Sequence, residues 1–144
     1  MPNTILFSRR STALVAILLL AAGCNDGKPT GVPVSGVVLI DGKPLTMGSV
    51  QFVPAGARPS GGGINKEGRF VLSCYEQGDG AVVGSHRVRV TAAHNLSETS
   101  LRWDAPKMYA DIATSGLKVD VDGPTDSVVI SLTWNGGKPF VERQ

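Results

Sequence analysis

The sequence predicts an all-β fold, a seven-stranded antiparallel β-sandwich that follows a helical signal peptide. Three observations favour this prediction. Short segments rich in Val, Ile, Leu and Phe alternate with polar residues, and Gly, Pro, Asn and Asp separate them at regular intervals. No segment after residue 24 shows a helical period over ten residues. A chain of 144 residues suits one domain of this kind.

The first predicted strands flank a tight turn. Residues 33–40 are rich in β-branched side chains, and Asp41-Gly42 follows. This pair is a strong signal for a type I′ turn, because both turn positions need a positive φ. Residues 48–54 then alternate, with Val50 and Phe52 on one face. The next expected elements are a flexible loop over 56–63, a tight turn over 65–68 and a strand over 69–75.

The second half of the domain shows the cleanest alternation. Within 85–92, one face holds His86, Val88 and Val90, and the other holds Arg87, Arg89 and Thr91. A turn-rich link over 76–84 precedes this strand. Two more strands are expected over 116–121 and 127–134, the latter with Val128, Ile130, Leu132 and Trp134 inward. Short strands of this kind with regular turns favour an immunoglobulin-like antiparallel sandwich of seven strands. Residues 135–144 are expected to be a loose tail.

The N-terminus has the pattern of a bacterial lipoprotein signal. Arg9 and Arg10 precede an apolar run over 13–22, which is half the length that a membrane-spanning helix needs. Residues 20–24, Leu-Ala-Ala-Gly-Cys, resemble a lipobox, although Ala21 stands where many lipoboxes have Leu. We therefore expect cleavage before Cys24 and lipidation of its thiol. The alternatives are an ordinary secretory signal and, on a weaker pattern match, a twin-arginine signal.

This signal sets the expected domain organisation and location. It predicts a signal peptide over 1–23, a flexible polar tether over 24–32, a β-sandwich over 33–134 and the C-terminal tail. Two or three acyl chains anchor a protein stably. The domain would face the periplasm or the cell exterior, attached to the cell membrane or the outer membrane. After cleavage 12 basic residues balance 12 acidic ones, so no charge excess favours a nucleic-acid partner.

Catalytic and metal motifs are weak. His86 is predicted to be a core residue, and His94 begins a long loop where it could act as a base, but no G-x-S-x-G elbow is present. Residues 120–123 match the start of a calcium loop without its later ligands. The histidines and Cys74 have no zinc spacing. Cys74 is expected to be a buried, inert thiol. We expect no enzyme activity, no cofactor and no metal.

The segment 94–115 fits no predicted strand, and long loops in compact domains are often functional. Trp103 and Tyr109 lie in it, and aromatic rings can stack on sugars. They are therefore the candidate ligand-binding residues, for a glycan or a peptide. The alternative interpretation is that both rings pack the loop onto the sandwich.

Four phrases occur together: VSGVVLIDGKPLTMGSVQFVP, GRFVLS, GDGAVVGSHRVRV and MYADIATSGLKVDV. In combination they resemble small planctomycete-type cell-envelope lipoproteins that have a carboxypeptidase-regulatory-like, or transthyretin-like, domain. The resemblance covers roughly 32–132. It implies a prealbumin-like sandwich of about seven strands outside the cytoplasm, without known catalytic residues. The C-terminal Tyr-Arg-Gly-Ser ending of transthyretin-like hydrolases is missing, since the chain ends in PFVERQ.

These observations predict a non-catalytic, lipid-anchored β-sandwich module of the bacterial envelope that binds or scaffolds. The alternative is a glycan- or peptide-binding envelope protein that uses the 94–115 loop. The partners expected are the membrane, through the lipid on Cys24, and an envelope protein or a glycan.

Overall fold

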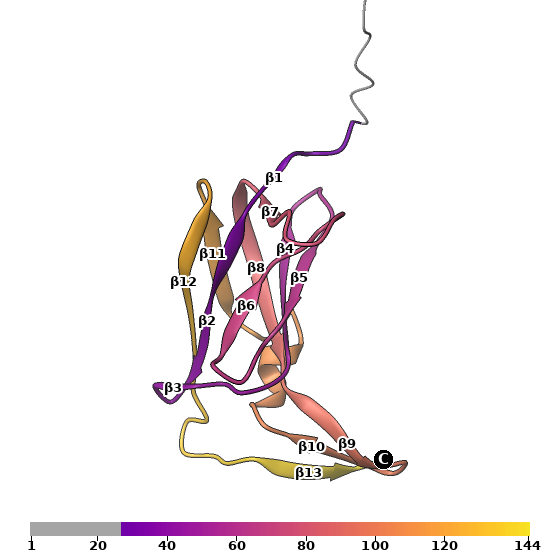
Figure 1. Ribbon diagram of the computed structural model, residues 1–144. Coiled ribbons are helices and arrows are strands. Elements are labelled where there is room, and N and C mark those ends of the chain that lie inside the picture. The colour runs from indigo at the N-terminus through magenta and orange to yellow at the C-terminus, as the bar shows by residue number, and fades with distance from the viewer. Residues whose placement is uncertain (1–26) are drawn as a thin grey trace, which may run out of the picture.

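The computed structural model describes residues 27–144, which form thirteen short strands and one 3-10 helix (Figure 1). The expected signal peptide and Cys24 lie outside these residues. The first strands are β1 (Gly31–Val32), β2 (Val34–Ile40), β3 (Lys43–Pro44), β4 (Ser49–Pro54), β5 (Ser60–Gly63), β6 (Arg69–Val71) and β7 (Ala81–Val82). They are followed by β8 (Gly84–Thr91), β9 (Ala93–Ser97), β10 (Ser100–Trp103), the 3-10 helix η1 (Lys107–Ala110), β11 (Leu117–Val121), β12 (Thr125–Leu132) and β13 (Phe140–Arg143).

The all-β prediction is confirmed, and the packing is sandwich-like. One layer, the β8 sheet, has the strand order β11-β8-β4-β5. The other layer, the β2 sheet, consists of β12, β2, β3 and β6, with β2 at its centre. A third sheet, the end sheet, has the order β13-β10-β9 and extends from one end of the two layers (Figure 1).

The core fills the space between the β8 sheet and the β2 sheet. Phe52 from β4 and Phe70 from β6 meet across this space, with ring centroids 6.1 Å apart. The inward residues of β8 are buried as their alternation predicted. The other buried apolar residues include Val34, Val38, Leu45, Val50, Leu72, Val121, Ile130 and Leu132. Burial of these side chains is the main force that joins the two sheets, because each removes apolar surface from water.

Two predicted turns are confirmed by their backbone geometry. Asp41 and Gly42 have φ values of 47° and 78°, as a type I′ turn requires, and they join β2 to β3. In the turn over 65–68, the Asn65 side-chain oxygen accepts hydrogen bonds from the Glu67 and Arg69 amides at 3.0 and 2.8 Å. The Asn65 side chain thus satisfies backbone groups that the short turn leaves without a partner.

Two features of the sheets differ from the prediction. The described residues contain more strands than seven, because several predicted strands are divided and new ones occur. The pairing of β2 with β12 is parallel, whereas a fully antiparallel sandwich was expected. β12 starts beside the start of β2, where the Thr125 amide donates to the Pro33 carbonyl at 3.0 Å, so both strands run in the same direction.

Part of the expected flexible loop is β5. Its Gly-rich sequence has low strand propensity, but backbone hydrogen bonds form on both of its sides. It pairs with β4, and Gly61 exchanges two 2.9 Å backbone bonds with Ser73. These bonds connect the β8 sheet to the β2 sheet along one edge. Similarly, Gly31 and Val32, at the end of the expected tether, form β1 by pairing with β7.

The expected loop over 94–115 and the expected loose tail are also largely ordered. β9, β10 and η1 account for most of the first segment, and β13 forms within the second. β13 is a strand because it pairs with β10 over four residue pairs, from Ser100↔Arg143 to Trp103↔Phe140. Trp134, expected in the core, is half-buried and makes an edge contact with Phe140. The end sheet therefore combines the two segments whose sequence predicted no strand.

The chain enters and leaves the molecule at opposite ends. Residues 27–30 form no strand and lead into β1, at the end where β1 pairs with β7. The end sheet lies at the other end, and the C-terminus is on it (Figure 1). Among the described residues, no helix has the length and apolar character needed to cross a membrane.

Candidate functional site

The two aromatic residues proposed from the sequence as ligand-binding are both buried, each with about 7% of its surface exposed. Trp103, in β10, stacks on Phe140 with ring centroids 6.4 Å apart. Its indole Nε1–H donates to a Glu142 carboxylate oxygen at 2.9 Å. Tyr109, in η1, packs in the core, and its hydroxyl accepts from the Thr133 amide at 3.3 Å. Neither ring offers a free face on which a sugar could stack.

The Glu142 carboxylate joins β13 to η1 as well as to β10. One oxygen binds the Trp103 indole, and the other accepts from the Lys107 ammonium at 2.7 Å. These hydrogen bonds, first that from Lys107 and then that from Trp103, hold the pKa of Glu142 below its ordinary value. The Lys107 nitrogen also lies 5.7 Å from the centroid of the Trp103 ring. The aromatic residues of this region thus hold the end sheet together.

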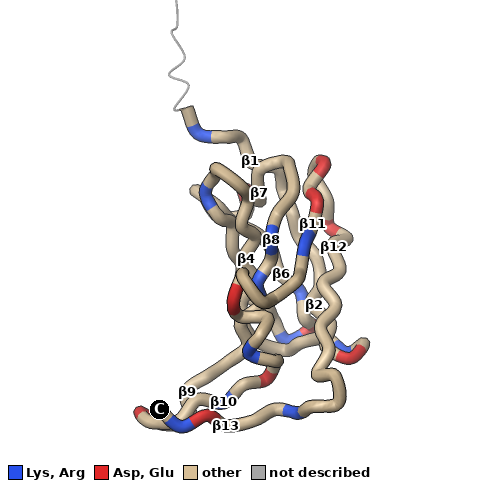
Figure 2. Tube along the Cα trace, turned by 180° about the vertical axis from the view of Figure 1, so that it is seen from behind, with Lys and Arg blue, Asp and Glu red and all other residues tan. Residues whose placement is uncertain are grey.

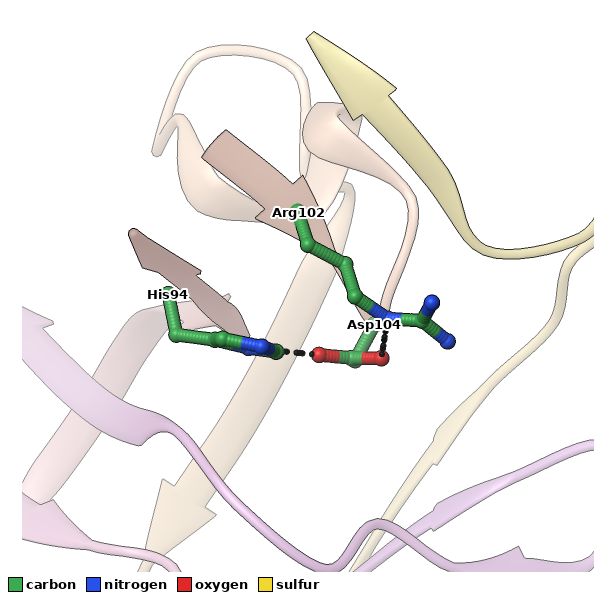
Figure 3. A network of polar contacts seen from close by, with 3 residues as sticks. All are labelled: His94, Arg102 and Asp104. Carbon is green, nitrogen blue, oxygen red and sulfur yellow. Dashed lines mark hydrogen bonds and ion pairs between the residues drawn. The ribbon is translucent and has the colours of Figure 1, made fainter. Parts of the chain in front are cut away.

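A second polar network lies on the end sheet, between β9 and β10 (Figure 3). His94 faces Arg102 in the strand register, and Asp104 directly follows β10. One Asp104 oxygen is 2.9 Å from His94 Nδ1, and the other accepts from Arg102 Nε at 2.9 Å. The Asp104 amide donates to the Ala92 carbonyl at 2.8 Å, which fixes the backbone that holds the carboxylate.

The exposure of these side chains makes the network accessible from solvent. The side chains of His94 and Arg102 are each 43% exposed, and that of Asp104 is 21% exposed. Asp104 engages Nδ1 of the imidazole, so Nε2 points away from the carboxylate. The orienting half of an acid–base dyad needs a hydrogen bond between these two groups, and among the described residues this Asp104 oxygen has no hydrogen-bond partner despite the short distance. Within residues 27–144, moreover, no hydroxyl or thiol is hydrogen-bonded to His94, so the arrangement lacks a nucleophile in place.

Sequence reasoning singled out His94 but missed Asp104 and Arg102. The missing signal was the hairpin that joins β9 to β10. Ser97 and Ser100 share a 2.6 Å hydrogen bond across this turn, and the Ser97 hydroxyl also accepts from the Thr99 amide at 3.3 Å. Regular pairing from Ser97 and Ser100 would place His94 opposite Trp103, and an irregularity between Ser100 and Leu101 shifts the register by one residue, so that His94 faces Arg102.

The remaining candidate residues, His86 and Cys74, contact the core and backbone carbonyl groups. His86 is 1% exposed, as predicted for a core histidine, and lies against Phe52 with ring centroids 5.7 Å apart. Its Nε2 is 2.8 Å from the Val82 carbonyl oxygen. Cys74 is half-buried, with its sulfur 3.7 Å from the carbonyl oxygens of Arg58 and Pro59. In the part of the chain that the structure describes, no three His, Cys, Asp or Glu side chains gather at one point.

Comparisons with known proteins gave no relatives: no protein-family model, no curated protein and no solved structure matches this chain.

Proposed function

We propose that the chain is a non-catalytic, lipid-anchored module of the bacterial cell envelope that binds or scaffolds a partner protein. Its domain would belong to the transthyretin-like β-sandwiches, as the resemblance of residues 32–132 implies. The anchor would be the lipid on Cys24, which follows the apolar run and small residues of a lipobox. Six residues, 25–30, separate Cys24 from β1. Fully extended, they reach about 20 Å.

The end sheet is the observation that favours a binding role. β9 and β13 are its outer strands, and within the described residues each has one backbone edge without a strand partner. Free edges of this kind can accept a strand from another protein. Three exposed large apolar side chains belong to the same sheet: Leu96 (54% exposed), Phe140 (41%) and Val141 (49%). Phe140 and Val141 point to opposite faces of the sheet, so each face has an exposed apolar side chain beside an open strand edge, which favours a protein partner.

The position of the end sheet fits an anchored protein. β1, which follows the tether, and the end sheet lie at opposite ends of the sandwich (Figure 1). A domain attached through Cys24 would present β9, β10 and β13 on the side away from the lipid. The alternative, binding of a glycan or peptide through 94–115, would use His94, Arg102 and the outer edge of β9, because Trp103 and Tyr109 are buried.

Two measurements test this function. The intact mass of protein extracted from membranes is compared with that of Cys24→Ala. We expect a chain that starts at Cys24 with added acyl mass, and no such product from the variant. An unlipidated chain, or one cleaved elsewhere, would contradict the anchor.

The role of the end sheet is tested separately by photo-cross-linking in cells. A photoreactive residue replaces Val141 on β13, and the control replaces Val129, which is 57% exposed on β12 in the β2 sheet. We expect an envelope protein to cross-link at position 141 and not at 129. Equal cross-linking at both positions would contradict the assignment of the end sheet.

A further inference from the structure

The outer face of the β8 sheet has a row of basic side chains. Arg87 and Arg89 alternate outward from β8 and are exposed. Lys118 on β11 pairs with Arg87, and Gln51 on β4 pairs with Arg89. Paired residues on antiparallel strands point to the same face. The three cations and Gln51 therefore share the surface opposite the core, and Figure 2 shows basic residues along β8 and β11.

The positive charge of this face is not neutralised within the protein. The three ion pairs among residues 27–144 involve Asp104, twice, and Glu142, and none includes Arg87, Arg89 or Lys118. The register places one carboxylate on the same face, that of Asp120, which accepts a hydrogen bond from the Ser85 hydroxyl. The face thus has three cations and one anion, although the mature chain as a whole is balanced.

Two hollows lie along this face. The first, of about 320 Å³, is lined by Ser49, Gln51, Arg89, Thr91 and the glycines 61–63 of β5. The second, also of about 320 Å³, is lined by Val53, Ala55, Ser85, His86, Arg87 and Lys118. Arg89 and Arg87, two residues apart on β8, each line one of them. Hollows of about 340 and 310 Å³ also lie elsewhere on the protein, so the cations that line these two, rather than their volume, distinguish this face.

The glycines of β5 have different roles on the two faces. A Cβ at Gly62 would lie 2.2 Å from the Val71 carbonyl oxygen, so packing requires glycine there. A Cβ at Gly63 would meet nothing within 4 Å, and one at Gly61 would meet only the Val50 carbonyl oxygen at 3.4 Å. Packing therefore does not require glycine at 63 and restricts position 61 little. Because Gly61 and Gly63 have no side chains, no side chain covers the outer face of β5 beside Gln51 and Arg89.

We propose that the outer face of the β8 sheet binds an anionic polysaccharide, one with uronate or sulfate groups, which lies along β8. Guanidinium groups bind carboxylate and sulfate oxygens through paired N–H donors. The amide of Gln51 and the hydroxyls of Ser49 and Thr91 suit sugar hydroxyls. No Phe, Tyr or Trp ring lines either hollow, and the imidazole of His86 is only 1% exposed, which disfavours a neutral glycan held by stacking and a nucleic acid held through its bases. This site does not depend on the lipid anchor or on the end sheet.

The test is binding of fluorescently labelled polygalacturonate and heparin oligosaccharides to the full chain in detergent, with dextran as the neutral control. We expect binding to both anionic glycans, none to dextran, and weakening of about tenfold or more in the double variant Arg87→Gln/Arg89→Gln. The matched control, Lys43→Gln/Lys66→Gln, removes the same charge from exposed positions elsewhere, in β3 and in the turn over 65–68, and should bind within about twofold of wild type. Equal losses in both double variants would overturn the proposal, because binding would then follow net charge alone.

A variant without a charge change tests the hollow itself. Gly63→Leu places a side chain in open space above the outer face of β5. It should keep the melting temperature of wild type and lose glycan binding by about tenfold. Unchanged binding in a folded Gly63→Leu protein would contradict the site. Tighter binding of poly-glutamate, or of phosphatidylglycerol vesicles, than of either glycan would instead assign the face to an acidic protein or to a membrane.

Discussion

The Glu142 side chain joins β13 to both β10 and η1. Its two carboxylate oxygens bind Trp103 and Lys107, from β10 and η1, at 2.9 and 2.7 Å. Both partners favour the charged form, which is why the pKa of Glu142 is lowered. A group whose pKa is depressed in the folded state stabilises the fold above its unfolded pKa. That stabilisation is lost as the pH falls through the folded pKa.

The first prediction therefore concerns Glu142→Gln. The variant should have a lower melting temperature than wild type at neutral pH, because the amide carries no charge for Lys107. The difference should shrink as the pH falls below the ordinary value of 4.5 for the carboxyl group, and it should be lost once the pH lies below the lowered pKa of the folded state. Thermal denaturation followed by circular dichroism measures it. Glu98→Gln, at the exposed β9–β10 turn, is the control and should show no such pH dependence. A difference that persists in acid would contradict the role of the charge.

The hydrogen bonds of Asp79 join residues that are close in the sequence, and a local sequence pattern can predict such contacts more easily than it can predict which strands pair. The Asp79 carboxylate accepts hydrogen bonds from the amides of Cys74, Tyr75 and Glu76 at 2.6, 2.8 and 3.0 Å. These bonds, the one from Cys74 first, lower the pKa of Asp79. All partners lie within five residues of Asp79, so a turn-rich link was readable from the sequence. The partner of Trp103, by contrast, is Glu142, which is 39 residues away.

At the scale of elements, the alternation of apolar and polar residues identified the strands that contribute to the core. It did not identify strands that form only because a neighbouring strand supplies their backbone hydrogen bonds. β8 alternates cleanly, and its buried and exposed faces were predicted correctly. β5 and β13 have no such pattern. β5 contains three glycines, and β13 follows a run of exposed polar residues. Both are strands because a neighbouring strand supplies their backbone hydrogen bonds. The parallel pairing of β2 with β12 has the same origin, since no local sequence encodes a distant partner.

The second prediction tests whether β13 is a structural part of the end sheet. A chain that ends at Asn135 lacks Phe140 and Glu142, which cover Trp103. We expect the emission of Trp103 to shift to longer wavelength, measured in a Trp134→Phe background so that Trp103 alone reports. The lost stacking with Phe140 should cost about 1 kcal/mol of unfolding free energy, and the lost Glu142 contacts should lower stability further.

Two single substitutions test which side chain of β13 covers Trp103. Phe140→Ala should reproduce part of the emission shift, because the two rings stack at 6.4 Å. Val141→Ala should not, because Val141 pairs with Arg102 and points to the opposite face. An unshifted Trp103 in the truncated chain would show that β13 does not cover it.

At the scale of the whole molecule, the two ends of the sandwich differ in chemistry. Beside the tether, Lys28 and Arg58 lie over the ring of Tyr75, at 5.5 and 5.1 Å from its centroid. Tyr75 is 39% exposed. Tyrosine is enriched at membrane interfaces, and lysine and arginine are attracted to anionic lipid surfaces. The other end has the end sheet, with its open strand edges and exposed apolar side chains. The meeting of Tyr75 and Arg58 at this end could not be predicted from the sequence, because β4, β5 and β6 bring the two side chains together.

The third prediction follows from this difference and rests on the proposed lipid anchor. In vesicles that contain brominated lipids, a tryptophan near the bilayer loses emission. Trp103 and Trp134 belong to the end sheet or contact it, so the lipidated wild type should be quenched little. Tyr75→Trp adds a ring at the tether end, and its additional emission should be strongly quenched. The same substitution in Cys24→Ala, which cannot be lipidated, should show no quenching, because no anchor holds it near the lipid. Strong quenching of the wild type would mean that the end sheet lies on the bilayer, and the partner site would then have to be sought on the outer faces of the β8 and β2 sheets.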